Sequence, residues 1–217
     1  GAARQACCPP PDRSATIRPA AVPLRPCPFM KIFRNALEAS RAFPSAVVTI
    51  GKFDGIHRGH RRVLGMALAR ARALKTHSLV LTFDPESEQH TRLYSYRPLL
   101  SLAERLDQFR RLGFDAAVLL PFDRALACLS PQAFAENVLA LQLKPLCVVV
   151  GEDFCFGKDR AGNIDSLERS GQGLGFLVES VPLLKDDGEK SSAARIRELI
   201  EKGEREKAAD LLGRALG

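Results

Sequence analysis

The chain alternates short apolar runs with longer segments in which apolar and charged residues recur at helical spacing. Two of the runs, SLVLTF (residues 78–83) and LCVVVG (residues 146–151), are apolar at nearly every position. Such runs are typical of strands covered on both faces, which occur in parallel sheets flanked by helices. The pattern therefore predicts an α/β protein with a Rossmann-like, doubly wound parallel sheet.

The same pattern predicts where the individual elements lie. Strands are predicted at Ala46–Ile50, Ser78–Phe83, Ala116–Leu120, Cys147–Val150 and Phe176–Val178. Helices are predicted at Arg58–Lys75, Leu102–Leu112, Pro131–Leu141, Ala193–Lys202 and Arg205–Leu212. Ser130 before Pro131 supports the third helix start, because serine is a common N-cap and proline is favoured at the first helical position.

Three of the predicted strands are followed directly by polar loops, GKFDGIHRGH, DPESEQH and GEDFCFGKDRAG. Because ligands of parallel α/β sheets bind outside the carboxyl ends of the strands, these loops should converge on one pocket. The 217 residues suffice for one α/β domain of good size.

Residues 1–29 differ from the rest of the chain in composition. They contain seven of the fourteen prolines, three of the six cysteines and no helical or strand period. We interpret residues 1–29 as a disordered leader, with Met30 as the natural start of one domain that covers residues 30–217. Translated upstream sequence and an arginine-rich organelle transit segment both fit the leader, and we favour the first. The cysteines are scattered without metal or disulfide spacing, which favours reduced thiols and a cytoplasmic protein.

The formal charge of +7 falls to +4 (28 basic against 24 acidic residues) when residues 1–29 are left out. A balance of this size suits an enzyme for anionic nucleotides as well as a nucleic-acid binder. No basic stripe interleaved with aromatic residues is visible, so we expect no nucleic-acid partner. No apolar run approaches the length that spans a bilayer, so we expect no membrane partner.

The loop Gly51–His60 contains the most specific chemistry. His57 and His60 are three positions apart, so they project on the same side if both lie at the start of a helix. A helix N-terminus offers N–H groups and a positive dipole end to phosphate, and two imidazoles can add hydrogen bonds to a developing phosphoryl charge. The competing interpretation of such a histidine pair is an ordinary capped helix end. The preceding strand, the glycines and the long following helix favour a nucleotide site.

Other phosphate and metal motifs fit less well. GEDFCFGKD has one residue too many between its glycines for a P-loop, and Asp159 stands where that motif needs Ser or Thr. GQGLGF lacks the dinucleotide-binding spacing and does not link a strand to a helix. Only four histidines and no suitable cysteine pair are present, which makes a zinc site a weak alternative.

A strand followed by H-x-G-H resembles the nucleotidylyltransferase superfamily, and the wider sequence resembles one of its members. GKFDGIHRGH, LVLTFDP, LLPFDRALACLSPQAF, VVVGEDFCFGKDRAG, IREL and LLGR are similar to the FMN adenylyltransferase module of bacterial-type FAD synthetases. The similarity covers roughly residues 30–214, in the same order and spacing. It implies the transfer of AMP from ATP to FMN with Mg²⁺, which gives FAD and pyrophosphate. A riboflavin kinase module often follows LLGR in that family, and the resemblance leads us to expect only the adenylyltransferase half here.

The resemblance also implies roles for individual residues. His57, His60 and Arg197 would act on the phosphates as catalytic residues, and Ser192 would lie beside them at the second nucleotide motif. The wall of the ATP site would comprise Gly51, Phe53, Asp54 and Gly55. The FMN side would comprise Asp84, Asp153, Phe154, Phe156 and Arg160. Core packing is the alternative for the two phenylalanines, and a solvated helix position is the alternative for Arg197.

The sequence departs from the family in two places. The second motif of the family carries Ser-Ser-Thr before Ile-Arg, whereas this chain has Ser192, Ala193 and Ala194 before Arg195-Ile196-Arg197. Ser191 and Ser192 compensate if the loop shifts, since serines are natural caps. The family usually has His-Pro after TFDP, whereas Glu86-Ser87 stand here, and an acid beside anionic FMN should weaken binding or change the substrate.

These departures leave alternatives to an active FMN adenylyltransferase. One is a divergent paralogue that binds flavin or nucleotide with little catalysis. Another is an enzyme that adenylylates a different phosphate acceptor.

Overall fold

The computed structural model describes residues 29–84, 98–182, 185–186, 189–190 and 192–214. Six parallel strands form one sheet in the order β1-β4-β3-β2-β5-β6. Their bounds are β1 Lys31–Phe33, β2 Val47–Ile50, β3 Ser78–Asp84, β4 Ala116–Pro121, β5 Cys147–Gly151 and β6 Leu177–Val181. The order reverses direction between β2 and β5, which makes their carboxyl ends the switch point where ligands bind in such sheets. The predicted doubly wound α/β fold is thereby confirmed.

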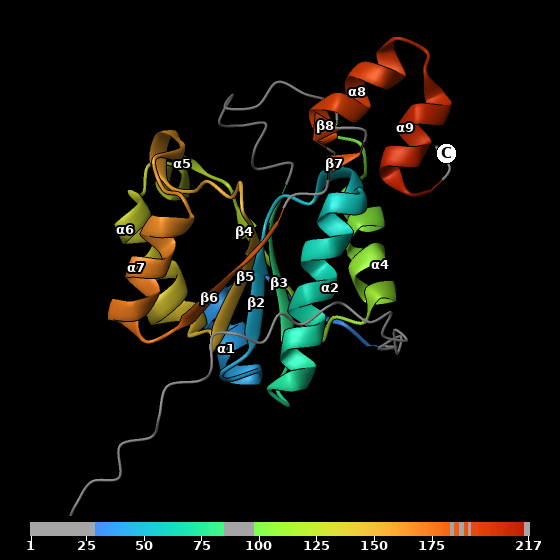
Figure 1. Ribbon diagram of the computed structural model, residues 1–217. Coiled ribbons are helices and arrows are strands. Elements are labelled where there is room, and N and C mark those ends of the chain that lie inside the picture. Colours follow the sequence, from blue (N-terminus) through green and yellow to red (C-terminus); the bar gives the residue numbers. More distant parts are fainter. Residues whose placement is uncertain (1–28, 85–97, 183–184, 187–188, 191, 215–217) are drawn as a thin grey trace, which may run out of the picture.

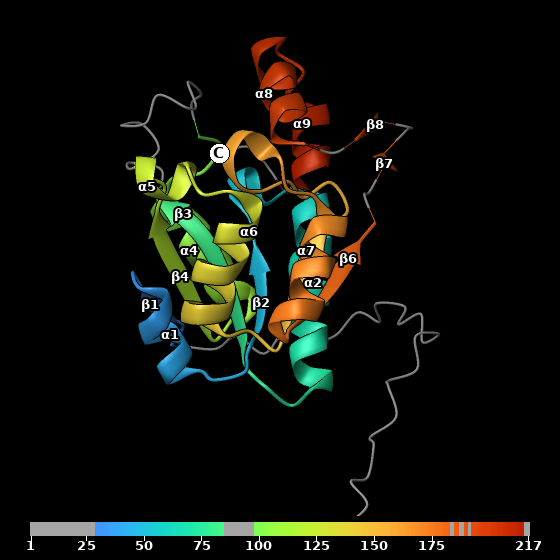
Figure 2. The same cartoon turned by 90° about the vertical axis from the view of Figure 1, so that its left-hand side faces the viewer.

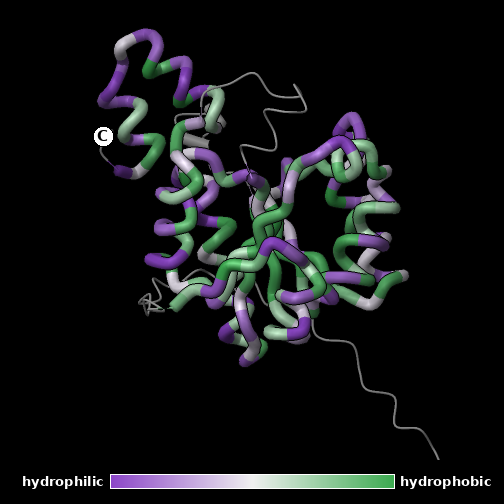
Figure 3. The backbone as a smooth tube through the Cα atoms, turned by 180° about the vertical axis from the view of Figure 1, so that it is seen from behind, coloured by the Kyte–Doolittle hydropathy of each residue, from purple (hydrophilic) through white to green (hydrophobic). Residues whose placement is uncertain are grey.

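Helices cover both faces of the sheet (Figures 1 and 2). One face packs against α2 (Arg58–Ala73) and α4 (Leu102–Leu112). The other face packs against α1 (Ala36–Ala42), the helical turns that continue α6 (Pro131–Ala133), and α7 (Ile164–Leu174). The four inner strands, β4, β3, β2 and β5, are buried along nearly their whole length because both of their faces are covered. Figure 3 accordingly shows hydrophobic chain through the middle of the molecule.

The structure corrects two predicted elements. Instead of running as one α-helix to Leu141, the chain after Pro131–Ala133 winds as a π-helix from Phe134 to Leu143. The buried residues of this π-helix recur four to five positions apart, as the wider i→i+5 turn requires, and they are Phe134, Ala135, Val138, Leu139 and Leu143. The last predicted strand begins at Leu177 rather than Phe176 and continues to Val181, because it is an edge strand covered only in part.

The remaining predicted elements agree with the structure to within two residues. The elements that were not predicted are β1, α1, α5 (Arg124–Ala127), α7 and the short strands β7 (Lys185–Asp186) and β8 (Glu189–Lys190). Asn163 caps α7 reciprocally with Ser166, at 3.0 Å and 2.9 Å. Gly171 lies in α7 where a Cβ atom would approach the carbonyl oxygen of Phe176 to 2.6 Å. The glycines of GQGLGF therefore end a helix and allow close packing, consistent with their rejection as a phosphate motif.

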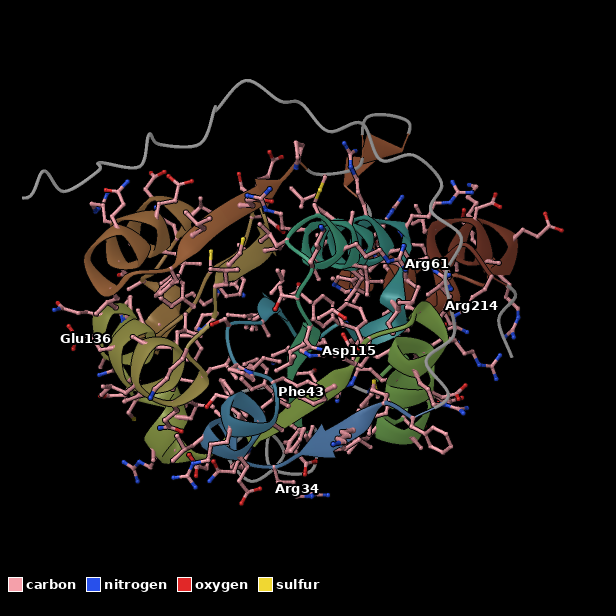
Figure 4. All side chains as sticks on the ribbon, turned by 90° about the horizontal axis from the view of Figure 1, so that it is seen from below. Arg34, Phe43, Arg61, Asp115, Glu136 and Arg214 are labelled. Atoms are coloured by element: carbon pink, nitrogen blue, oxygen red, sulfur yellow. The ribbon has the colours of Figure 1, made fainter. Side chains whose placement is uncertain are left out.

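The amino ends of the strands, opposite the carboxyl ends, are joined by side-chain hydrogen bonds. The carboxylate of Asp115 accepts hydrogen bonds from the amide and hydroxyl of Ser78, at 2.8 Å and 2.9 Å. His77 stacks edge-to-face on Phe43 with 4.8 Å between ring centroids, and Figure 4 shows Phe43 and Asp115 in the view of this end of the sheet. His77 therefore lies at the far end of the strands from His57 and His60.

Two short helices stand at the carboxyl end of the sheet, above α2 and α4 (Figures 1 and 2). They are α8 (Ala193–Glu201) and α9 (Arg205–Leu212), and they share a small core of Ile196, Leu199, Ala208 and Leu212. Leu99 packs against this core. The C-terminal helix pair therefore docks on the segment that precedes α4, which places the start of α8 above the strand ends.

The described cysteines, Cys128, Cys147 and Cys155, are all free. Burial, with a smaller contribution from Glu179, raises the pKa of the Cys147 thiol to about 12. Within the described ranges, no helix is both long and apolar enough to cross a membrane.

Candidate active site

A cavity of about 530 Å³ opens at the carboxyl ends of the strands, where the polar loops were expected to converge. It is lined by residues from the ends of β2, β3, β4, β5 and β6 and by the start of α8. Of the residues predicted from sequence, those in the wall are Gly51, Phe53, Asp54, His57, His60, Asp153, Phe154, Phe156, Arg160, Ser192 and Arg197. The fold thus gathers predicted residues from three distant segments, namely the first loop, the loop after β5 and the start of α8, around one space.

The first loop turns sharply between β2 and α2. Phe53, Gly55 and Ile56 have positive φ angles of 51°, 80° and 42°. Only glycine adopts such angles without cost, so the backbone at Phe53 and Ile56 is strained, and strain of this kind concentrates at functional sites. Gly55 does not line the cavity: a Cβ atom there would approach Leu99 to 2.9 Å. Its place under the C-terminal helix pair indicates a packing function rather than ligand contact.

His57 is the N-cap of α2, and its Nδ1 accepts a hydrogen bond from the amide of His60 at 3.4 Å. The imidazoles of His57 and His60 stack with 3.7 Å between centroids, and Phe53 meets His60 edge-to-face at 5.3 Å. The two histidines therefore do project on the same side. His57 caps α2 and also stacks on His60, so the capped helix end and the histidine pair belong to one structure. We call this start of α2, with His57 and His60, the histidine corner.

Asp54 and Arg197 join the first loop to α8. The Asp54 carboxylate accepts hydrogen bonds from the amides of Leu99 and Leu100, at 2.8 Å and 3.3 Å, and forms an ion pair with Arg197. The Asp54 side chain is 9% exposed and that of Arg197 is 21% exposed. Arg197 is therefore not a solvated helix arginine, and the pair connects residues 143 positions apart in the chain.

The second nucleotide motif lies at the N-terminus of α8. The Ser192 hydroxyl accepts a hydrogen bond from the amide of Arg195 at 3.3 Å and so caps the helix, as a serine at this place should. Ala193 and Ala194 line the cavity in the first turn of α8. Ser191, the other serine considered as a cap, lies outside the described residues.

Aromatic side chains form the apolar part of the cavity. Phe154 and Phe156 stack with 5.5 Å between centroids, and Phe134 of the π-helix lies 5.8 Å from Phe156. Phe156 also belongs to the core on that face of the sheet, so packing and cavity lining are combined in this residue. Phe83 and Phe122 supply further aromatic lining from the ends of β3 and β4, with 5.3 Å between their centroids. Neither was singled out from sequence.

Asp84, like Gly55, is a predicted residue that lies outside the cavity wall. It ends β3 but does not line the cavity, and its carboxylate pairs with Arg34 at 3.5 Å. Figure 4 shows Arg34 at the outer edge of the molecule beside β1. The departures at Glu86 and Ser87 lie outside the described residues.

A buried arginine missed from sequence supports two of the loops. Arg105 of α4 is 5% exposed, and its guanidinium donates to the carbonyl oxygens of Lys52 at 2.5 Å and Phe83 at 2.8 Å. An arginine in the pattern LAERLDQFRRL resembles its exposed neighbours, so only its position on the apolar side of the helix could have indicated this contact.

A second pair of arginines lies outside the cavity. Arg61 of α2 and Arg214, just after α9, both stand on the side of α2 where the C-terminal helices dock (Figure 4). Burial, with a smaller contribution from Arg214, lowers the pKa of Arg61. These two side chains therefore add positive charge beside the cavity without lining it.

The described residues contain no cluster of three or more His, Cys, Asp and Glu side chains placed to hold a metal ion. Mg²⁺ in nucleotide sites is commonly bound by one or two carboxylates together with the substrate phosphates and water. Asp153 in the cavity wall is a carboxylate that suits an ion of that kind. The donor set fits a cation that is carried in on a nucleotide.

The chain is similar to proteins of one family. The family model described as FAD synthetase matches residues 39–195. A putative bifunctional riboflavin kinase/FMN adenylyltransferase of Geobacillus thermodenitrificans is 42% identical over 78% of this chain and 90% of that protein. Bifunctional riboflavin kinase/FMN adenylyltransferases of Pseudomonas fluorescens and Escherichia coli K12 are 34% and 31% identical over 85% of this chain, which spans 60% and 59% of their lengths.

A solved structure described as a macrolide-efflux protein from Streptococcus pneumoniae superimposes with a TM-score of 0.70 and 29% identity. The superposition covers 86% of this chain and 60% of that one. The family match and the superposition each cover most of the chain, and the histidine corner lies within the matched residues. This chain belongs to the FAD synthetase family.

Proposed function

We propose that this chain transfers the AMP moiety of ATP to the phosphate of FMN, giving FAD and pyrophosphate. The observation that carries the proposal is the stacked pair His57 and His60 at the start of α2, which faces the same cavity as the aromatic wall. The names of the relatives, FMN adenylyltransferases, support this reaction over binding without catalysis. The proposal concerns AMP transfer only.

The chemistry follows from the geometry of the corner. A phosphate oxygen of FMN forms a bond to the α-phosphorus of ATP, the bond from that phosphorus to the oxygen bridging to the β-phosphate breaks, and pyrophosphate leaves. The reaction accumulates negative charge on the phosphoryl oxygens, so positioning and electrostatic stabilisation provide most of the catalysis. We assign this stabilisation to His57, His60 and Arg197, with the amides at the N-terminus of α8 beside them.

The other assignments divide the cavity between the two substrates. Gly51, Phe53 and the amides after Ser192 contribute to the ATP side. Phe154 and Phe156 offer aromatic faces to the flavin, and Asp153 and Arg160 offer polar contacts at the same loop. Mg²⁺ enters with ATP and offsets the charge of its phosphates. Asp54 acts on ATP indirectly, as a positioning residue for Arg197.

The test of the proposal is direct. Purified protein incubated with ATP, Mg²⁺ and FMN should form FAD and pyrophosphate in equal amounts, measured by chromatography and a pyrophosphate assay. FMN binding without FAD formation would contradict catalysis and leave a flavin-binding paralogue. AMP transfer to other phosphorylated acceptors, but not to FMN, would contradict the acceptor.

The role of Asp54 predicts a specific pattern of non-additivity. Asp54→Asn keeps one acceptor oxygen for the amides of Leu99 and Leu100 but removes the charge that holds Arg197. Arg197→Met removes the guanidinium. We expect each variant to lower kcat/KM for ATP by roughly 10- to 100-fold, the range expected for loss of a charge-assisted contact. Steady-state kinetics of both variants and of the double variant measure the effect.

Because a positioning residue works through its partner, Asp54→Asn should have little further effect in the Arg197→Met background. Losses that simply multiply would show that Asp54 acts on the substrate by itself. Glu198→Gln is the matched control, since Glu198 lies one residue away on α8 and pairs with Arg195 at the surface. It should leave kcat/KM within about twofold.

The alanines of the second motif predict a gain. Ala193→Ser with Ala194→Thr places two hydroxyls in the first turn of α8 at the cavity wall. Two added donors to the phosphates should raise kcat/KM for ATP by about tenfold. Initial rates of FAD formation measure the change. An unchanged or lower rate would indicate that Ser192 and the helix amides already satisfy the phosphates.

A further inference from the structure

Lys52 lies in the cavity wall, although neither the motif arguments nor the assignments above give it a role. It follows β2 by two residues, within the first loop. Its ammonium Nζ lies 5.4 Å from the ring centroid of Phe122, just after β4. Because β3 separates β2 from β4 in the sheet, the Lys52 side chain extends across the end of β3.

The backbone of Lys52 is held firmly. Its carbonyl oxygen accepts the buried Arg105 guanidinium at 2.5 Å and the Thr82 hydroxyl at 3.3 Å. The neighbouring amide of Gly51 donates to the carbonyl of Leu81 at 3.1 Å. The backbone that carries the Lys52 side chain is therefore held in place, and its ammonium packs over the Phe122 ring. Such pre-organisation reduces the entropy that a lysine loses when it binds an anion.

The Lys52 side chain points towards one part of the cavity wall, which differs in chemistry from the rest. The part over β3 and β4 is apolar, with Phe83, Phe122 and Leu126 in its wall. The part over β5 and β6 contains Gly151, Val181 and Pro182, together with Phe154 and Phe156, which follow β5. The start of α8 stands above the strand ends. His57 and His60 start α2 beside the switch point between β2 and β5. Lys52 therefore carries positive charge from the histidine corner towards the apolar part over β3 and β4.

FMN has the matching chemistry, an apolar aromatic ring joined by a short chain to a phosphate dianion. We propose that Lys52 binds the phosphate of this acceptor and gives the site its preference for a phosphorylated flavin, an inference that rests on the proposed function. Arg160, the cation first assigned to the flavin loop, is exposed, whereas Lys52 is partly buried. Contact with a partly buried cation is less screened by water than contact with an exposed one.

In this arrangement Lys52 changes neither protonation nor bonding during the reaction. It keeps its charge beside the FMN phosphate while a phosphate oxygen attacks the α-phosphorus of ATP and pyrophosphate leaves. Its positive charge offsets the repulsion between two anionic substrates that must approach within bonding distance.

Binding of FMN and riboflavin, which differ only by the phosphate, tests this inference without turnover. Flavin fluorescence titrations of wild type, Lys52→Met and Lys52→Arg give both dissociation constants. We expect Lys52→Met to weaken FMN by about 10- to 100-fold and to change riboflavin by less than about twofold. Lys52→Arg should restore part of the difference. Lys158→Met is the control, because Lys158 is exposed beside the same cavity but does not line it.

Four outcomes would overturn the inference. They are equal weakening of FMN and riboflavin in Lys52→Met, loss of ATP affinity alone, unchanged FMN affinity, and loss of the phosphate preference in Arg160→Met instead. Equal thermal unfolding midpoints for all variants establish that each is folded. Failure of wild type to form FAD refutes the proposed reaction, whereas FAD formation with an unchanged Lys52→Met preference refutes only the role of Lys52.

Discussion

Substitution of His57 or His60 by alanine is expected to lower the rate of FAD formation by about 10²- to 10³-fold, the effect of removing one donor to a developing oxyanion. The two rings stack at 3.7 Å and share one helix start, so they should act as a unit. The double variant should therefore be no more than slightly slower than the slower single variant. Single-turnover measurement of FAD with saturating ATP and FMN isolates the chemical step.

His57 also caps α2, so His57→Ala should destabilise the protein by about 1 kcal/mol in addition to its kinetic effect. His57→Asn separates the two roles, because asparagine is a good N-cap but lacks the imidazole. We expect His57→Asn to recover the unfolding midpoint of wild type and to stay slow. Recovery of both stability and rate would mean that the cap alone matters, and turnover that survives both alanine substitutions would remove the histidine corner from the mechanism.

Arg105→Met is expected to cost about 2–4 kcal/mol of unfolding free energy, since the carbonyl oxygens of Lys52 and Phe83 lose buried, charged donors. Urea denaturation followed by circular dichroism measures the loss. The same substitution should weaken FMN binding, because both carbonyls belong to segments that line the cavity. Arg105→Lys should retain part of the stability, as a lysine can reach one carbonyl but cannot bridge two in a fixed plane.

Arg111→Met on the same helix is the matched control. Arg111 is 71% exposed and pairs with Asp107 at the surface, so its loss should change stability by less than about 1 kcal/mol. Equal losses for the two substitutions would show that the carbonyl contacts of Arg105 contribute nothing beyond a surface charge.

The elements that could be predicted from sequence were those whose pattern reflects burial on both faces. Central strands such as Ser78–Asp84 are mostly apolar and buried along nearly their whole length, and α4 has regular helical spacing with a Ser101–Glu104 capping box. β1 has three residues and β6 is an edge strand covered in part, so neither shows a strong pattern. The π-helix could not be predicted, because its wider turn is visible only as burial at Phe134, Val138 and Leu143.

The candidate site also has one part that could be predicted from the sequence and one part that could not. The geometry of the loop from Gly51 to His60 could be predicted from its sequence, because a strand, glycines, two histidines and a helix start are all local features. The roles of these residues stay predictions until the kinetic experiments are done. The family resemblance implies a place for Asp84 on the flavin side. In the structure, Asp84 ends β3 outside the cavity wall and pairs with Arg34, which directly follows the edge strand β1.

By itself, the sequence determined the parallel sheet, the histidine corner and the order of the loops that follow the strands. Only the tertiary structure decided that Asp54 holds Arg197, that Arg105 braces two loops, and that Lys52 reaches Phe122. The physical reason is the distance along the chain between the residues that interact. Local periodicity records which face of an element is buried, whereas contacts between distant segments depend on strand order and on helix docking, and residues 143 positions apart carry no shared pattern.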